Sequence, residues 1–307
     1  MRKAMAWTAK YIIQNGKKIA FDEARVHPFS VGHAYGGTVF EGIRAYMNYS
    51  TGKLAVFRLE EHLVRLDQGM KFMRFDNPPS RDEMRQAVLD AVRANEPDDD
   101  AYIRIQVHIE SLGSMASTGG VGWACGAMPR ERNAKRSSGL SVHVSSWTRI
   151  TDTTMPPRIK ATANYHAGRI AMLQAKVDGY DNALLMTRAG KISEGTGACL
   201  FMVRDGKLVT PSRENDILES VTRDTVIQLA AEHGLAVEQG IIDRTELYIA
   251  DELFFCGTGQ ELLPITSVDK LPVGDGKPGA ITMRLQEAYE SVVRGTTNAH
   301  AEWRTPV

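Results

Sequence analysis

The spacing of apolar residues changes at Arg58, and this change limits the chain to folds that combine sheet and helix. Before Arg58, residues 38–46 and 54–57 read as two short strands with turn residues between them. After it, over residues 58–73, apolar side chains recur at the spacing of an amphipathic helix, at Leu59, Leu63, Leu66, Met70 and Met73. A purely helical or purely β fold is therefore excluded.

The remaining chain mixes strands and helices without regular alternation. Residues 11–19 predict a hairpin around Asn15-Gly16, and residues 81–94 predict a helix capped by Ser80. Further helices are predicted over 165–177, 222–233 (closed by Gly234) and 247–251. Further strands are predicted over 102–109, 140–147, 182–186, 200–203, 207–209, 235–242 and 252–256. This order favours an α+β fold over a doubly wound parallel sheet.

A shift in composition suggests where the chain divides. Its 307 residues suggest about two domains. Residues 111–138 are rich in Gly, Ser and Ala and include the charged segment MPRERNAKR. We therefore expect a small N-terminal α/β domain over 1–127, an interdomain loop over 128–138 and a large C-terminal domain over 139–307.

Charge and cysteine content exclude several classes of protein. Lys+Arg and Asp+Glu are both 37, and this balance disfavours a nucleic-acid or membrane-surface protein. The N-terminus lacks the apolar segment of a signal peptide, and no apolar run is long enough to span a bilayer. Three widely spaced cysteines, Cys125, Cys199 and Cys256, do not form a disulfide framework pattern. We expect a cytoplasmic protein with free thiols.

Common ligand motifs are incomplete. Gly195-Thr196-Gly197 resembles the start of a dinucleotide fingerprint but lacks its third glycine. The histidines have neither the i, i+4 pair nor the E-x-x-H pattern of a helical zinc site, so no metal is expected. There is also no Walker A pattern and no G-x-S-x-G elbow.

Five segments carry a specific resemblance when they are taken together in this order. They are VGHAYGGTVFEGIRAY (31–46), KATANY (160–165), GKISEGTGACLF (190–201), ILESVTRD (217–224) and ADELFFCGTGQELLPI (250–265). Together they resemble the class IV, fold-type IV pyridoxal-phosphate aminotransferases, and within these the branched-chain amino-acid aminotransferase group. The resemblance implies two α/β domains of the D-amino-acid-aminotransferase-like fold, pyridoxal 5'-phosphate as cofactor, a homodimer or larger assembly, and a site at the domain boundary.

The resemblance selects Lys160 as the catalytic residue. A transaminase needs an amine that forms an imine with the cofactor aldehyde, and burial and positive neighbours favour the uncharged form of a lysine. The neighbours Ile159, Ala161 and Ala163 are small or apolar, as at a buried strand end. Without the matched motif, Lys160 would read as one of many surface lysines.

The resemblance also assigns residues to the parts of the cofactor. Glu194 matches the carboxylate that keeps the pyridine nitrogen protonated, and Tyr165 matches the partner of the ring 3-oxygen. For the phosphate it implies Arg65 and the start of a helix at Val221 and Thr222, and Thr258 could add donors to the phosphate or to the substrate carboxylate. From the residues alone, Arg65 could instead pair with Glu61 one helical turn away. Family members usually carry glycine where this chain has Ser220.

Six positions match the substrate pocket of the branched-chain group: Tyr35, Phe40, Gly42, Arg44, Tyr102 and Arg104. Arg130 and Gly259 are two further candidates for substrate binding. Phe40 and Tyr102 are expected to form apolar walls, and Arg104 to receive a distal carboxylate. Arg44 could instead pair with Glu41 or Glu61 on the protein. Arg130 lies where the family has a tyrosine, and its alternatives are a substrate-carboxylate contact or a solvated linker charge.

These matches imply ping-pong transamination between an L-amino acid, with Leu, Ile or Val favoured, and 2-oxoglutarate. An (R)-selective amine transaminase and a D-amino-acid transaminase remain alternatives within the same fold. The non-enzyme alternative is a protein that binds pyridoxal phosphate without turnover. No nucleic-acid or membrane partner is expected.

Overall fold

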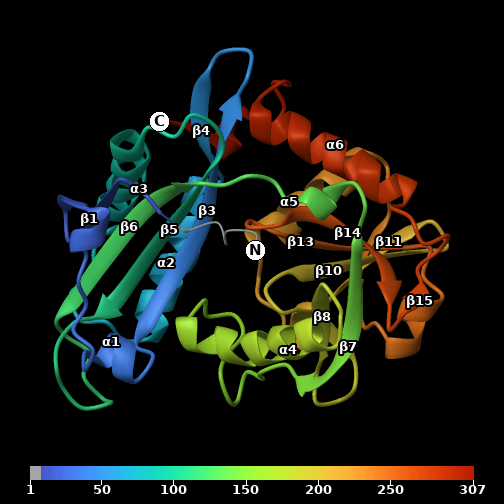
Figure 1. Cartoon of the computed structure of the whole chain (residues 1–307), viewed down its shortest axis with the longest axis horizontal. Coiled ribbons are helices and arrows are strands. Elements are labelled where there is room, and N and C mark those ends of the chain that lie inside the picture. The colour runs from blue at the N-terminus through green and yellow to red at the C-terminus, as the bar shows by residue number, and fades with distance from the viewer. Residues whose placement is uncertain (1–7) are drawn as a thin grey trace. The chain divides into compact units, whose positions relative to one another are not determined.

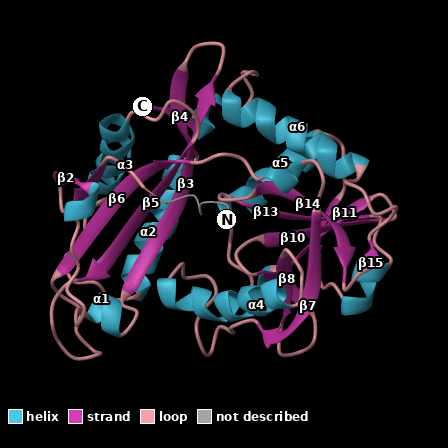
Figure 2. Ribbon diagram, in the orientation of Figure 1, coloured by secondary structure: helices cyan, strands magenta, loops and turns pink. Residues whose placement is uncertain are grey.

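A computed structural model describes residues 8–307, and they form two compact units. The first comprises the described residues up to Glu131, Ile159–Ala163 and Val292–Val307, and the second comprises Arg132–Arg158 and Asn164–Ser291. Each unit contains one sheet and helices packed against it (Figures 1 and 2). The mixed architecture agrees with the expected α+β class.

The first unit is built on a seven-stranded antiparallel sheet in the order β16-β4-β3-β5-β6-β1-β2. Its helices α2 and α3 contribute Leu63, Leu66, Val88 and Val92 to one core with Ile43 and Ile103 of the sheet. The bounds are β1 Tyr11–Gln14, β2 Lys17–Ala20, α1 Val31–Ala34, β3 Thr38–Asn48, β4 Lys53–Phe57, α2 Leu59–Phe72, α3 Arg81–Asn95, β5 Ala101–Ile109, β6 Val121–Pro129 and β16 Arg304–Pro306.

Local sequence signals explain several of these boundaries. Asn15 and Gly16 both have positive φ, 48° and 78°, as expected for the hairpin turn between β1 and β2. Ser80 caps α3 in a reciprocal capping box with Glu83. The predicted hairpin and the predicted start of α3 are therefore confirmed.

The second unit contains a nine-stranded mixed sheet, in which β12-β11-β10-β13-β14-β7-β8-β9 follow one another and β15 pairs with β14. The pairs β11–β12, β7–β14 and β7–β8 are parallel. The bounds are β7 Leu140–Thr148, α4 Tyr165–Val177, β8 Asn182–Met186, β9 Ile192–Gly195, β10 Cys199–Arg204, β11 Lys207–Pro211, α5 Val221–Glu232, β12 Val237–Gly240, β13 Glu252–Gly257, β14 Glu261–Val268, β15 Leu271–Pro272 and α6 Ala280–Arg294.

Some local predictions need correction. The short helix expected over 247–251 is a 3-10 helix over Arg244–Tyr248, because Asp243 and Glu246 form a capping box further upstream. The expected strand over 235–242 is reduced to β12. Part of the Gly- and Ser-rich segment forms β6, which pairs with β5 along its whole length. We did not anticipate α6.

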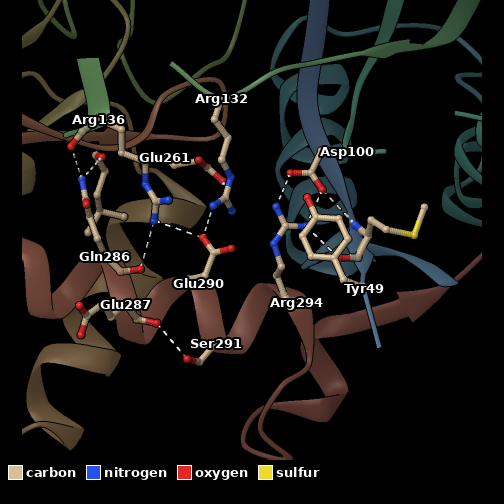
Figure 3. A network of polar contacts seen from close by, with 12 residues as sticks. Tyr49, Asp100, Arg132, Arg136, Glu261, Gln286, Glu287, Glu290, Ser291 and Arg294 are labelled. Atoms are coloured by element: carbon tan, nitrogen blue, oxygen red, sulfur yellow. Dashed lines mark hydrogen bonds and ion pairs between the residues drawn. The ribbon is translucent and has the colours of Figure 1, made fainter. Parts of the chain in front are cut away.

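The C-terminal residues lie with the N-terminal sheet. β16 pairs with β4 through Arg304–Phe57, and the Arg294 guanidinium binds the buried Asp100 carboxylate at 2.8 and 2.9 Å (Figure 3). We had placed these residues in the C-terminal domain over 139–307. Pairing between strands distant in the sequence explains why Val292–Val307 belongs to the first unit.

The three cysteines are buried free thiols. Burial raises the pKa of Cys256, and its strand neighbour Cys199 raises it further. Among residues 8–307, no helix is long and apolar enough to cross a membrane.

Candidate active site

Lys160 lies in a short segment that docks on strand β3 of the first unit. The Phe40 N–H donates to the Lys160 carbonyl at 3.0 Å, and Val39 forms a bridge with Ala161. Ala161 is buried in the core of this unit, as its small apolar side chain predicts. The Lys160 Nζ lies 4.8 Å from the centroid of the Phe40 ring.

One face of β3 and β5 carries most of the predicted substrate residues. Strand residues alternate between faces, and the register pairs Gly42 with Arg104 and Arg44 with Tyr102. The guanidinium carbon of Arg104 lies 3.8 Å from the Phe40 ring centroid. A Cβ on Gly42 would lie 1.9 Å from the Tyr102 hydroxyl, so this glycine leaves the room that the tyrosine occupies.

Other predicted substrate residues lie at the ends of elements. Tyr35 follows α1 and is 53% exposed. The Arg130 N–H donates to the Asp100 carbonyl at 3.0 Å. Arg44 is buried and donates through Nη2 to the Glu131 carbonyl at 3.4 Å. Arg44 therefore contacts the backbone beside Arg130.

Arg65 is held by a buried carboxylate, and this partner differs from the one considered in the sequence. Its Nε and Nη2 donate to Glu41 at 2.7 and 2.8 Å, and His62 Nδ1 lies 2.8 Å from Glu41 Oε2. Glu61 pairs with Arg58. The i, i+4 alternative for Arg65 is therefore wrong. Glu41 lies on the helix-packed face of β3, opposite its neighbours Phe40 and Gly42.

The charge state of this cluster follows from burial and contacts. Burial alone would raise the pKa of Glu41, but Arg65 and the hydrogen bonds from Arg65 and His62 hold that pKa well below its usual range. Burial is the largest influence on the pKa of His62, and together with the charges of Arg65 and Lys160 it lowers this pKa despite the opposing effect of Glu41. Since His62 is then neutral near pH 7, it acts on Glu41 as a hydrogen-bond donor through Nδ1.

Glu194 forms the corresponding buried pair in the second unit. Its Oε1 lies 2.6 Å from Arg149 Nη2, and its Oε2 accepts from the Leu218 N–H at 3.1 Å. The Cys199 thiol lies 3.8 Å from Oε2. Arg149 is itself fixed by donating through Nε to the Asp216 carbonyl. Glu194 is therefore a buried anion and not a solvated turn residue.

Tyr165 is placed by close packing between α4 and the loop after β9. A Cβ on Gly168 would lie 2.4 Å from the Thr196 carbonyl oxygen, so only glycine permits this approach. Tyr165 lies one helical turn before Gly168, and a Cβ on Gly197 would lie 3.8 Å from its ring. Tyr165 thus begins α4 beside the loop that follows Glu194.

Thr222 and Thr258 come together at the start of α5. Their hydroxyl oxygens lie 3.4 Å apart, and Val221 is the first residue of the helix. Ser220 has an extended backbone (φ −84°, ψ 131°), and its hydroxyl accepts from the Arg223 N–H. Glycine is therefore not required at Ser220, which acts as the N-cap. Gly259 follows Thr258 in the turn between β13 and β14.

Each unit, taken by itself, holds side chains whose chemistry suits part of an anionic, aromatic cofactor. The first unit supplies the Lys160 amine and the Arg65 guanidinium. The second supplies the Glu194 carboxylate, two hydroxyls and the N-terminal end of α5, where first-turn N–H groups have no intrahelical acceptor. Within residues 8–307, no cluster of His, Cys, Asp and Glu could hold a metal ion.

Sequence reasoning missed the partners of these side chains. Glu41 stands in the quoted F-E-G-I-R motif, so the sequence offered a signal for this residue, although not for its pairing with Arg65. Arg149 and His62 stand outside any motif that we interpreted. Their contacts join segments 45 and 21 residues apart, a separation that no local pattern reports.

Comparison with known proteins gives consistent matches over nearly the whole chain. The family described as amino-transferase class IV matches residues 38–268. The branched-chain-amino-acid aminotransferase of Salmonella typhimurium is 36% identical, over 97% of this chain and 98% of that protein. That of Pseudomonas aeruginosa is 37% identical, over 95% and 96%.

Solved structures agree with these sequence matches. The branched-chain amino acid aminotransferase from Thermobaculum terrenum in its PLP form superposes with a TM-score of 0.92 at 42% identity, covering 98% of this chain and 99% of that one. The corresponding Escherichia coli enzyme superposes with a TM-score of 0.92 at 35% identity, covering 97% and 99%.

Proposed function

The chain belongs to the class IV aminotransferase family, and we propose that it transfers amino groups from branched-chain L-amino acids to 2-oxoglutarate with pyridoxal 5'-phosphate as cofactor. The similarity to branched-chain aminotransferases supports this substrate class. The observation that carries it is the face of β3 and β5 beside Lys160. This face combines the apolar Phe40 ring with the Arg104 guanidinium. Such a surface accommodates both a leucine-like and a glutamate-like side chain.

Pyridoxal phosphate supplies a reactive aldehyde and an electron-withdrawing pyridine ring. Lys160 would hold the cofactor through its side-chain amine, and the free amine would be placed to carry a proton from the substrate α-carbon. Glu194 holds the proton on the pyridine nitrogen, with Arg149 keeping the carboxylate in place. The Tyr165 hydroxyl binds the 3-oxygen of the ring.

The phosphate is bound by groups that suit a dianion. Arg65 contributes its guanidinium, Val221 and Thr222 contribute the N-terminal end of α5, and Thr258 contributes a hydroxyl. Phosphate at a helix N-terminus is a common arrangement because unsatisfied N–H groups and the helix dipole both favour negative charge.

The substrate is positioned by the other predicted residues. Phe40 and Tyr102 provide apolar contact, and Gly42 leaves the space that Tyr102 occupies. Arg104 binds the distal carboxylate of the glutamate pair. Arg44, Tyr35 and Gly259 complete the proposed pocket, with Arg44 also holding the backbone at Glu131.

Half-reaction spectroscopy on the purified holoenzyme tests this function. We expect L-leucine and L-glutamate to convert the cofactor band, and D-alanine and an (R)-arylalkylamine to leave it unchanged. Lys160→Ala should leave no covalently retained cofactor after borohydride treatment and mass spectrometry. Persistence of the band with both L-amino acids would reject the proposal.

An (R)-selective amine transaminase is the second candidate because Arg130 stands where the family has a tyrosine. We propose that Arg130 contacts the substrate carboxylate. Arg130→Ala should then impair turnover of 2-oxoglutarate more than turnover of a ketone without a carboxylate. Equal effects on both acceptors would remove this role, and preferred conversion of the (R)-amine would favour the second candidate.

We also propose a cytoplasmic homodimer or larger assembly. Exposed apolar side chains gather in two segments of the first unit that are joined by a Ser30–Leu112 bridge: Val26, Phe29 and Tyr35 in one, and Leu112 and Met115 in the other. A second copy of this chain is the expected occupant of this surface. Light scattering of the parent and of a Phe29→Ser/Met115→Ser variant tests this assembly. A parent that scatters as a monomer would contradict it.

A further inference from the structure

The turn between β13 and β14 carries Thr258 and Gly259 and closes on an unusual residue. Gly257 and Glu261 form the last strand pair, and the Gln260 N–H donates to the Gly257 carbonyl at 3.0 Å. Three-residue hairpin turns of this kind end in a left-handed residue, which is normally glycine. Here that residue is Glu261, with φ of 56°. A residue with a Cβ is disfavoured in this conformation.

The Glu261 side chain is held by an ion pair that the hairpin itself does not supply. The residue is 2% exposed, and its Oε1 accepts from Arg132 Nη2 at 3.3 Å. Arg132 also contacts Glu290 of α6, and Arg136 binds Glu290 at 3.2 Å (Figure 3). The next residue is held as well, since Gln286 donates to the Leu262 carbonyl at 2.9 Å. The turn is thus attached to α6 on its β14 side.

The turn also faces the start of α5 through its other end. Thr258 is the residue whose hydroxyl lies 3.4 Å from that of Thr222. A change in backbone conformation at Glu261 would therefore move the Thr258 hydroxyl and the Gly259 N–H relative to α5. These are groups that bind anions, whether a cofactor phosphate or a substrate carboxylate.

We propose that Glu261 and Arg132 are positioning residues that hold this turn in its anion-binding conformation. The ion pair keeps a non-glycine residue left-handed and so fixes Thr258 and Gly259. The inference rests on the proposed function of that turn. It predicts that the backbone conformation at 261 matters for binding, and that the carboxylate matters only because it maintains this conformation.

Glu261→Ala and Glu261→Gly separate these two contributions. Alanine removes the ion pair and keeps the conformational cost, whereas glycine removes the ion pair and the cost together. In both variants Arg132 retains Glu290 as a partner. We expect Glu261→Ala to raise the KM for 2-oxoglutarate or the Kd for pyridoxal phosphate by about 5- to 30-fold. Glu261→Gly should stay within about threefold of the parent for both constants.

The two constants distinguish the anion. A change confined to the KM identifies the substrate carboxylate, and a change confined to the cofactor Kd identifies the phosphate. Asp205→Ala is the matched control, because Asp205 is an exposed acidic residue with φ of 51° in the turn between β10 and β11. It should change neither constant.

Arg132→Met provides a second route if Glu261→Ala does not fold. It should raise the same constant as Glu261→Ala, and adding Glu261→Gly to it should restore binding. Equal losses in Glu261→Ala and Glu261→Gly, or no loss in either, would overturn the inference. An inactive parent with L-leucine and 2-oxoglutarate would instead contradict the proposed function, while the cofactor Kd would still test the turn.

Discussion

Each unit buries a carboxylate–arginine pair that includes a proposed cofactor residue, and the roles within these two pairs are opposite. In the first unit, Arg65 is the group proposed to meet the ligand, and Glu41 supports it. In the second, Glu194 is the group proposed to meet the ligand, and Arg149 supports it. The same ion pair can therefore present either sign of charge, depending on which partner faces the ligand.

The surroundings of the two carboxylates explain this difference. Glu41 is fully buried, with both oxygens bound by Arg65 and a second contact from His62. Glu194 has one contact from a side-chain cation, one from the Leu218 backbone and one from the Cys199 thiol. A carboxylate bound at both oxygens by one guanidinium is suited to orient that guanidinium. A carboxylate with one charged partner keeps more acceptor capacity for a ligand.

The largest effect is expected from removing Arg149. Arg149→Met leaves Glu194 as a buried charge without its cation, which should lower the free energy of unfolding by about 3–5 kcal/mol. Urea denaturation of the cofactor-free protein measures this loss. The double variant Arg149→Met/Glu194→Gln should recover a large part of it, because the buried charge is also removed. Additive losses in the double variant would show that the pair is not coupled.

The next effect separates the two carboxylates by activity. Glu194→Gln should lower kcat by roughly 100- to 1,000-fold at saturating cofactor, because the group that stabilises charge during the reaction is lost. Glu41→Gln should raise the cofactor Kd, while excess cofactor restores kcat. Steady-state kinetics across a cofactor titration distinguishes them. Glu60→Gln is the control. Glu60 lies on α2, as Arg65 does, but it forms a solvent-exposed pair with Arg85 of α3. If excess cofactor also restored the kcat of Glu194→Gln, the proposed difference between the two carboxylates would be wrong.

A smaller effect is expected on the face of β3 and β5 that lies opposite Glu41. Arg104→Leu removes a charged hydrogen-bond donor proposed for the distal carboxylate, which should cost about 1.5–3 kcal/mol in binding. The KM for 2-oxoglutarate should therefore rise by roughly 10- to 100-fold. The KM for 4-methyl-2-oxopentanoate should change little, because its side chain has no carboxylate. Equal increases for both acids would assign Arg104 a structural role through its contact with Phe40.

The smallest effect concerns the pH dependence of stability. The folded-state pKa values of His62 and His108 are lowered, chiefly by burial, so the unfolded chain binds more protons below its histidine pKa of about 6.5. Stability is therefore present above that pH and falls as the pH decreases. Glu41, whose folded pKa is also lowered, adds a further loss below about pH 4.3.

Urea denaturation at pH 7.5, 6.0 and 5.0 measures the histidine contribution. The free energy of unfolding should decrease from pH 7.5 to pH 5.0, and His62→Asn should make this decrease shallower. His33→Asn serves as the control, since His33 is exposed. A parent that gains stability toward pH 5 would contradict the neutral, buried state of His62.

Local signals predicted elements where one segment contains all the necessary information. The Asn15-Gly16 turn and the Ser80–Glu83 capping box each lie within four residues, and both were correct. The Gly and Ser content of the segment that contains β6 led us to place the division between the domains there. Its pairing with β5 instead makes part of the segment a strand. Helix α6 and the return of Arg304 to β4 depend on contacts with distant residues.

For the site, the matched motifs selected Lys160, Glu194 and Arg65, whose roles stay predictions. They did not reveal that Arg65 binds Glu41, that Arg149 binds Glu194, or that Arg132 holds Glu261 in a left-handed turn.

The amino-acid sequence by itself determined the mixed fold class, the Asn15-Gly16 turn, the start of α3 and the identity of the groups that can carry the chemistry. Only the tertiary structure decided which of these charged groups are paired and how deeply each pair is buried. The physical reason is that the repeat of apolar residues along a helix or strand, and the cap of a helix, depend on residues close together in the chain. The charge state and orientation of a buried side chain depend instead on burial and on partners that folding brings from distant segments.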